Sequence, residues 1–315
     1  MTVWPDNYWR NVMIEKEKAY IITGPTSGIG RAAAFELAKH GKVILVGRDA
    51  GRLQKTRAAI EKRGGKAVSI VCDLGEMDQC SRAAREIVAL DLRLCGLVNN
   101  VGIFLMRPRR NSVGCDLSYA TNHLGPFTLT EALISHLPDG ANVLFVASAV
   151  EDPLRKPAVA AGFRGGRYIS AEACARGEWL AGGSTRPGYD AYATTKQCTL
   201  ATALQLAHEH PRLSINAIEP GVTPATGLGR DAHPALILLL RVFSIMAPFV
   251  KHMSTPERAG RVIADIIINR SDRSGIYYDE NGHDKAPSDL VQDRAFCERV
   301  VDETRALLSF AENAG

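Results

Sequence analysis

The sequence predicts a doubly wound α/β fold, in which a parallel sheet of about seven strands is covered by helices on both faces. Three observations support this prediction. Short apolar segments alternate with segments of helical period along most of the 315 residues, as in repeated βαβ units. The strand segments are apolar throughout, which is typical of strands buried on both faces. The first strand ends in a glycine-rich turn that leads directly into a helix.

The glycine-rich turn joins the first strand, which ends at Thr23, to a helix that continues to Gly41. Gly24 permits the turn off the strand, and Gly28 removes the Cβ that would keep a diphosphate away from the backbone. Gly30 lets the helix pack close to the sheet. The N–H groups and the positive dipole end of this helix then face the diphosphate. Because no Gly-Lys-Ser/Thr ending follows, a P-loop is not supported. The turn is either a dinucleotide cradle or an ordinary strand-to-helix turn, and the rest of the chain has to decide between them.

The remaining elements follow in regular order, and their strand ends carry polar residues. Arg48, Asp73, Asn99 and Ser148 each come directly after an apolar run, and parallel topology gathers such ends at the ligand-binding edge of the sheet. The expected strands are 42–46, 67–72, 96–98, 142–147, 213–218 and 276–278, and the expected helices are 50–63, 76–90, 114–136, 189–209 and 290–308.

The whole chain, 1–315, is expected to form one domain with three additions: an N-terminal arm at 1–18, an insertion at 151–188 and a substrate-covering segment at 222–256. The insertion lacks a period and is rich in glycine and arginine, which predicts loops and short surface helices. The covering segment is apolar, but Arg241 at its middle and its prolines argue against a membrane-spanning helix. Contact with a membrane surface remains an open alternative.

The composition excludes several classes of protein. The net charge of +4 and the scattered basic residues favour solvated loops over a nucleic-acid surface. The seven cysteines form no CxxC pair and no regular framework, so we expect reduced thiols in a cytoplasmic protein and no metal site. We expect no signal peptide before the first strand, because residues 1–18 are mixed in charge and lack an apolar core of useful length.

Tyr192 and Lys196 lie four positions apart in the helix expected at 189–209, so their side chains emerge on one face. A tyrosine phenol has a pKa near 10, and an adjacent ammonium lowers that pKa by favouring the phenolate. A phenol tuned in this way can exchange a proton with a carbonyl oxygen. Such a pair also arises by chance, and its position after the fifth strand is what distinguishes it.

Six motifs occur in a characteristic order: Thr23-Gly-x-x-x-Gly-x-Gly30, Asn99-Asn100-Val101-Gly102, Asn122, Ser148, Tyr192-x-x-x-Lys196 and Pro220-Gly221. In this order and in these structural places they resemble the short-chain dehydrogenase/reductases, a family with the Rossmann fold. The resemblance runs from about residue 19 to residue 278. The stretch 274–278 is most similar to the retinol-dehydrogenase-like and protochlorophyllide-reductase-like branch. The long gap between the fourth and fifth motifs, from Ser148 to Tyr192, resembles the monomeric carbonyl reductases.

The resemblance implies a catalytic set. Tyr192 would be the general acid/base, and Lys196 would hold the nicotinamide ribose hydroxyls and lower the tyrosine pKa. Ser148 would hydrogen-bond the substrate oxygen, and Asn122 would anchor a water that relays protons from Lys196 to solvent. Each residue also has an ordinary alternative: a polar helix residue, a turn residue or a solvated lysine.

The resemblance also implies how the cofactor is bound. Adenosine would lie against the ends of the third and fourth strands, and nicotinamide would lie beside 220–222. The expected cofactor-binding residues are Gly24, Thr26, Ser27, Gly28, Ile29, Gly30, Arg48, Asp73, Leu74, Asn99, Val101, Gly102, Tyr192, Lys196, Pro220, Gly221, Val222 and Thr223.

Cofactor choice depends on the end of the second strand. An acidic residue there binds the ribose diol and repels a phosphate, whereas arginine pairs with the 2′-phosphate. Arg48 comes first at this position, so we expect NADP(H). Asp49 follows it and leaves NAD(H) open as the alternative.

The leading hypothesis is an NADP(H)-dependent reductase or dehydrogenase acting on a carbonyl or secondary alcohol. The apolar stretch 235–250 suggests a bulky or apolar small-molecule substrate, although a core-packing helix would have the same composition. Two alternatives are reduction of a carbon–carbon double bond in a large pigment, and a dinucleotide-binding sensor without turnover. We expect a monomer, because an insertion before Tyr192 can cover the helices through which family members usually pair.

Overall fold

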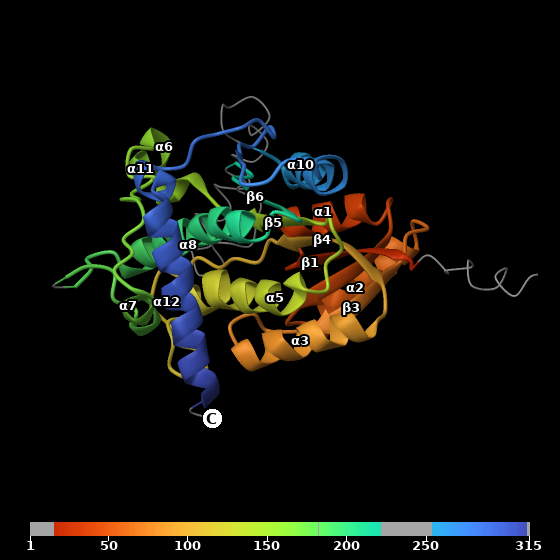
Figure 1. Cartoon of the computed structure of the whole chain (residues 1–315), viewed down its shortest axis with the longest axis horizontal. Coiled ribbons are helices and arrows are strands. Elements are labelled where there is room, and N and C mark those ends of the chain that lie inside the picture. The colour runs from red at the N-terminus through yellow and green to blue at the C-terminus, as the bar shows by residue number, and fades with distance from the viewer. Residues whose placement is uncertain (1–15, 182, 222–253, 314–315) are drawn as a thin grey trace, which may run out of the picture.

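A parallel, seven-stranded sheet forms the centre of the molecule in the order β3-β2-β1-β4-β5-β6-β7 (Figure 1). The computed structural model describes residues 16–181, 183–221 and 254–313. Every neighbouring pair of strands in the sheet is parallel, which confirms the predicted doubly wound α/β fold. The strands are β1 (Lys18–Thr23), β2 (Lys42–Gly47), β3 (Ala67–Val71), β4 (Arg93–Asn99), β5 (Asn142–Val146), β6 (Ser214–Ile218) and β7 (Tyr277–Tyr278).

Helices cover both faces of the sheet, and each face has its own apolar core. On β1, Ala19 and Ile21 belong to the first core, and Tyr20 and Ile22 belong to the second, because successive strand side chains point to opposite faces. The first core is covered by α3 (Met77–Ala89), α5 (Gly125–Ile134) and α8 (Pro187–Glu209). The second is covered by α1 (Gly28–Leu37), α2 (Ala50–Glu61) and α10 (Pro256–Asn269), and Figure 1 shows α1 and α10 side by side.

The helix expected at 114–136 contains a π-helical turn and begins later than predicted. It consists of α4 (Leu117–Tyr119), the π turn η2 (Ala120–Leu124) and α5, and Asp116 caps its start. Pro126 has no N–H group and cannot donate to the carbonyl of Asn122 four residues before it. The Thr199 hydroxyl lies 3.3 Å from that carbonyl, but its nearer acceptor is the Thr195 carbonyl at 2.8 Å. The proline thus removes one α-helical bond at the turn that carries a predicted site residue.

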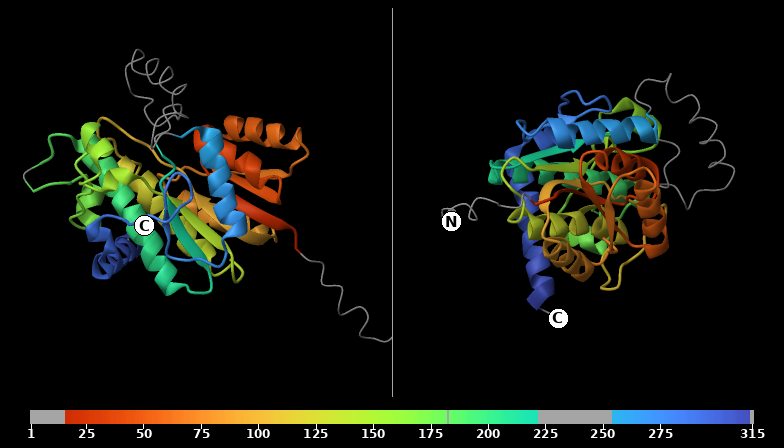
Figure 2. Two further views of the ribbon diagram at one scale, coloured as in Figure 1. Left: turned by 90° about the horizontal axis from the view of Figure 1, so that it is seen from above. Right: turned by 90° about the vertical axis from the view of Figure 1, so that its right-hand side faces the viewer.

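Between β5 and α8 the described residues form loops and three short helices, η3 (Ala149–Glu151), α6 (Lys156–Ala160) and α7 (Ala171–Arg176), and α8 begins at Pro187 within the range expected for the insertion. The predicted C-terminal helix is divided at Asp293 into α11 (Asp289–Gln292) and α12 (Arg294–Asn313). Helix α12 packs along α8, and Arg305 on α12 forms salt bridges of 2.8 Å with Glu131 on α5 and 2.5 Å with Glu209 on α8. Figure 2 shows α12 along one flank of the molecule.

Some predicted features lie outside the described residues. These are nearly all of the N-terminal arm, most of the segment expected to cover the substrate, and its apolar stretch at 235–250. Among the residues that are described, no helix is long and apolar enough to cross a membrane.

Candidate active site

The glycine turn between β1 and α1 has the shape of a cradle. Gly24 and Gly28 have φ values of +68° and +54°, the left-handed region that glycine adopts without strain. A Cβ on Gly30 would lie 2.3 Å from the Asn100 side-chain nitrogen, so the helix start packs where only glycine fits. Ser27 precedes α1 without a side-chain capping bond. The residues present therefore fit a dinucleotide diphosphate, which this turn would meet with backbone N–H groups.

Hydrogen bonds between the ends of β1 and β4 hold the cradle in place. The Thr23 hydroxyl accepts hydrogen bonds from the N–H groups of Asn100 and Val101, both at 3.0 Å. The Asn100 side chain donates to the Thr23 carbonyl at 2.8 Å. Sequence reasoning assigned no role to Asn100 beyond its place in the Asn-Asn-Val-Gly motif. The hydrogen bonds between Thr23 and Asn100 join two segments that are far apart in the sequence, so motif spacing alone does not predict them.

The remaining cradle residues, and those after β3 and β4, differ in how far they reach the surface. Thr26 is half-buried and Ser27 is exposed, whereas Ile29 is buried in the second core. The side chains of Leu74 and Asn99 are also buried. Two polar residues at the strand ends already have protein partners. Asp73 accepts from the Gly75 N–H at 3.0 Å, and Asn99 donates to the Thr130 hydroxyl at 2.8 Å.

At the end of β2, the two residues on which cofactor choice depends have different surroundings. Asp49 is the N-cap of α2, and its carboxylate accepts from the Arg52 N–H at 2.9 Å. The same carboxylate forms a 3.3 Å salt bridge with the Arg52 guanidinium. Arg48 is exposed at the strand end. The acidic side chain therefore has a structural partner, while the arginine faces solvent beside the cradle.

Lys196 is buried at the end of β5. Its ammonium donates to the Val146 carbonyl at 2.7 Å and lies 5.7 Å from the centre of the Tyr192 ring. Burial lowers the pKa of Lys196 to about 8, because the charged form loses its hydration. A Cβ on Gly102 would lie 3.4 Å from the ammonium and 3.8 Å from the Asn122 side-chain oxygen. The fold thus brings Gly102, Asn122, Tyr192 and Lys196 together.

The expected lowering of the tyrosine pKa is not found in the cofactor-free protein. Burial raises the pKa of Tyr192 to about 12. The Lys196 ammonium, which is bound to the Val146 carbonyl, does not offset this rise in pKa. The desolvation of the phenolate therefore dominates, and this part of the sequence prediction is corrected.

Asn122 is fixed by the backbone of the loop after β4. Its side chain accepts from the Ile103 N–H at 2.7 Å and donates to the Ile103 carbonyl at 2.9 Å. The same amide also donates to the Thr195 hydroxyl at 3.1 Å. Thr195 in turn donates to the Tyr192 carbonyl at 2.8 Å. Asn122 and Thr195 therefore position the first turns of α8, and sequence reasoning did not assign this role to Thr195.

Ser148 lies at the same end of β5, two residues beyond the carbonyl that accepts from Lys196. It is the N-cap of η3, and its hydroxyl accepts from the Val150 N–H at 3.5 Å. Among the described residues, no hydrogen bond joins Ser148 to Tyr192. After β6, Pro220 and Gly221 are half-buried, and Gly221 has a φ of +76°. Val222 and Thr223 lie outside the described residues.

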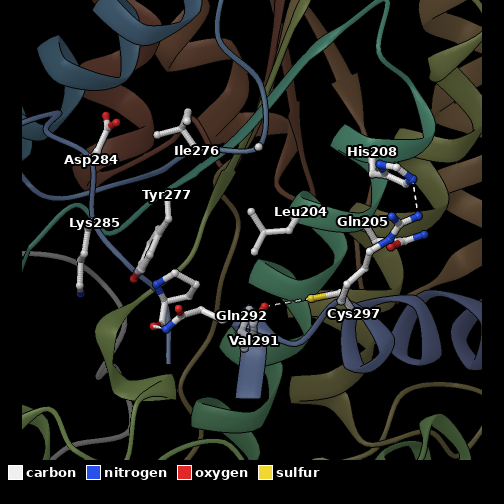
Figure 3. Close-up of a pocket in the computed structure, with 13 residues that line it drawn as sticks. Leu204, Gln205, His208, Ile276, Tyr277, Asp284, Lys285, Val291, Gln292 and Cys297 are labelled. Carbon is white, nitrogen blue, oxygen red and sulfur yellow. Dashed lines mark hydrogen bonds between the residues drawn. The ribbon is translucent and has the colours of Figure 1, made fainter. Parts of the chain in front are cut away.

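A separate cavity of about 500 Å³ lies between the second half of α8, β7 and the α11–α12 region (Figure 3). Leu204 and His208 line it, and the eight residues from Lys196 to Leu204 correspond to roughly 12 Å along the helix. It is therefore distinct from the candidate site. No cluster of potential metal ligands occurs in the described part of the chain.

Comparisons with known proteins agree with this geometry. A family model described as short chain dehydrogenase matches residues 18–156. A protochlorophyllide reductase of Chlamydomonas reinhardtii is 26% identical over 314 residues, which cover 93% of this chain and 76% of the relative. The putative daunorubicin C-13 ketoreductase DnrU of Streptomyces sp. (strain C5) is 28% identical over 215 residues, 68% of each chain.

Two solved structures share the fold. A blue fluorescent protein from a metagenomic library, in complex with NADPH, is 21% identical with a TM-score of 0.62, covering 84% of this chain and 96% of that one. A dehydrogenase/reductase from Sinorhizobium meliloti 1021 is 23% identical with a TM-score of 0.62, covering 84% and 94%.

Burial of Lys196 predicts a pH-dependent stability. Its pKa is about 8 in the folded protein against an ordinary 10.5, so between these pH values the unfolded chain binds more protons and the free energy of unfolding rises with pH. This contribution is absent from Lys196→Met. From pH 7 to pH 10 we expect wild type to gain about 2 kcal/mol relative to the variant in urea unfolding. Exposed Lys66→Met should parallel wild type; parallel profiles for Lys196→Met would contradict the assignment.

Proposed function

Because the chain belongs to the short-chain dehydrogenase/reductase family, whose members are NAD(P)-dependent oxidoreductases, we propose that it reduces the carbonyl group of a ketone or aldehyde, and in reverse oxidises a secondary alcohol. The observation that supports this most is the buried Lys196 ammonium beside Tyr192 at the end of β5. A buried cation and a phenol at the ligand-binding edge of such a sheet are suited to proton transfer.

When bound at the β1–α1 turn, a nicotinamide dinucleotide would supply the hydride that the carbonyl carbon receives. Tyr192 donates its phenolic proton to the carbonyl oxygen, so that one hydride and one proton convert the carbonyl to an alcohol. With a pKa of about 12, above its ordinary value near 10, the Tyr192 phenol carries the proton that it donates. Ser148 hydrogen-bonds the same oxygen in this scheme, and stabilises the negative charge that develops there.

Lys196 has two tasks in this scheme. It holds the ribose hydroxyls of the cofactor, for which the ammonium has to share or leave the Val146 carbonyl. Its positive charge then favours the phenolate as Tyr192 gives up its proton. The carbonyl of Asn122, which Pro126 deprives of its helical donor, is the acceptor for a water that returns a proton from solvent.

A second candidate is reduction of a carbon–carbon double bond in a large pigment. It is favoured by one observation: several of the curated relatives are protochlorophyllide reductases, including the Hordeum vulgare enzyme A, which is 25% identical over 84% of this chain. Activity in darkness without a bound pigment would contradict this candidate.

Tyr192→Phe tests the proposed reaction. We expect kcat/KM for ketone reduction in darkness to fall by about 10³-fold, because general acid catalysis typically contributes 10² to 10⁴. The dissociation constant of NADPH should change by less than about twofold, since the phenol acts on the substrate oxygen. Tyr20→Phe, on β1, is the matched control and should retain full activity. Unchanged turnover in Tyr192→Phe would contradict the role of Tyr192 as general acid, whereas absence of turnover in wild type together with intact function of Tyr192→Phe would favour a non-catalytic dinucleotide sensor.

For the cofactor we propose NADP(H) over NAD(H). Asp49 is engaged as the cap of α2 and by Arg52, whereas Arg48 is exposed at the end of β2. An exposed guanidinium there suits the additional 2′-phosphate of NADP(H). Because the Asp49 carboxylate already has these partners, it competes less for the ribose diol of NAD(H).

Arg48→Ala tests the cofactor proposal by titration of both reduced cofactors. Loss of the guanidinium should raise the dissociation constant of NADPH about 10-fold and leave that of NADH unchanged, since a hydrogen bond to a charged group is worth about 1.5–3 kcal/mol. Arg57→Ala removes an exposed arginine on α2 that pairs with Glu61 and serves as the control. Equal NADPH binding by wild type and Arg48→Ala would overturn the proposal.

We propose that the protein is a monomer. Helices α5 and α8 would form the usual pairing surface of the family, and here α12 packs along α8 and is tied to α5 through Arg305. The covering element is thus mainly α12, in addition to the expected insertion. Sedimentation should give a mass near 34.1 kDa, and a stable dimer would be the contrary result. For location we propose the cytoplasm, where thiols stay reduced, because none of the seven cysteines forms a disulfide; cell fractionation would test this.

A further inference from the structure

Four aromatic rings form a cluster around the proposed acid. Phe104 lies 5.3 Å from the Tyr192 ring and 5.2 Å from the Tyr189 ring, measured between centroids. Phe163 lies 6.0 Å from Tyr192 and 4.9 Å from Tyr189, and 5.9 Å from Phe104. All four residues are only half-buried, so aromatic surface remains accessible beside the proposed proton donor. We call Phe104, Phe163 and Tyr189 the aromatic wall.

The three members of the wall come from different parts of the chain. Phe104 belongs to the loop after β4, Phe163 belongs to the insertion, and Tyr189 lies in the first turn of α8. Further exposed apolar side chains occur on the same segments, because Met106 follows Phe104 and Val159 lies on α6, before Phe163. The aromatic wall is therefore a surface built from three separate segments of the chain.

The insertion is tied to the start of α8 on both sides of Phe163. Gly162, at a φ of +93°, accepts a 3.1 Å hydrogen bond from the Arg186 guanidinium on its carbonyl. Arg164 forms a 2.6 Å salt bridge with Asp190, whose side chain is 1% exposed. A buried carboxylate paired in this way is costly to separate from its partner. Phe163 is thus fixed between two anchors, each within a few residues of the catalytic helix turn.

Phe104 is fixed by close backbone packing. A Cβ on Gly188 would lie 2.1 Å from the Leu105 carbonyl oxygen, so the loop after β4 rests directly on the α8 backbone. The neighbouring Ile103 is held through its N–H and carbonyl by the Asn122 side chain. Both phenylalanines therefore have their positions set by groups next to them in the chain, which keeps their rings available for a ligand.

We propose, on the basis of the proposed function, that the aromatic wall selects carbonyl substrates whose carbonyl is conjugated to a planar aromatic ring system. Flat rings pack on other aromatic rings in stacked or edge-to-face geometry, and this adds to the gain from apolar burial. A ring system held against Phe104 and Phe163 would present its attached carbonyl beside the Tyr192 ring. A saturated skeleton of the same size is bulkier out of plane and lacks this stacking.

The test compares 2-acetylnaphthalene with its fully saturated counterpart, 2-acetyldecahydronaphthalene. Both kcat/KM with NADPH and the dissociation constant from NADP⁺-saturated protein are measured, in wild type, Phe104→Leu and Phe163→Leu. We expect wild type to favour the aromatic ketone at least 10-fold, and each variant to lose about 10-fold of that preference, as the loss of one aromatic pair allows. Phe35→Leu, a half-buried phenylalanine of α1 on the opposite face, should keep the wild-type preference.

The outcomes separate this inference from the proposed function. If neither ketone is reduced but the wall variants lose selective binding of the aromatic one, the inference stands and the proposed reaction fails. If wild type does not distinguish the two ketones, or if the variants weaken both ketones equally, the wall is only structural and the inference is overturned. Circular dichroism and thermal unfolding of each variant confirm that a loss of preference arises in a folded protein.

Discussion

The buried ammonium of Lys196 is the constraint on which the candidate site depends. A cation inside a protein needs close polar partners, and here the Val146 carbonyl at 2.7 Å supplies one. That bond joins α8 to the end of β5, at the edge where parallel sheets of this kind bind ligands. It places Tyr192, one helical turn earlier, at the same edge as the glycine cradle of β1 and α1.

The surroundings of this cation are arranged by features that interrupt regular structure. Pro126 removes the helical donor of the Asn122 carbonyl, and the π turn holds the Asn122 side chain against the loop after β4. Gly102 lies beside the ammonium, since a Cβ there would be in contact with it at 3.4 Å. The two apolar cores pack on both faces of the sheet. Functional sites commonly store such local departures.

Sequence reasoning predicted the features that depend on local pattern. The β–α alternation gave the fold, and the four-residue spacing of Tyr192 and Lys196 on a helix gave the central pair. It did not predict contacts made by segments that lack a helical or strand periodicity, such as the salt bridges between the insertion and Asp190 on α8. Nor did it predict the raised pKa of Tyr192, because that depends on where the ammonium points and how much water the fold excludes.

A crystal structure of the protein with bound NADP⁺ tests the central claim most directly. The account predicts that the dinucleotide diphosphate lies on the β1–α1 turn, that the Lys196 ammonium hydrogen-bonds the nicotinamide ribose, and that the Tyr192 hydroxyl faces the nicotinamide ring. A complex in which the Tyr192 hydroxyl is turned away from the nicotinamide, or in which Lys196 makes no contact with the cofactor, would contradict it.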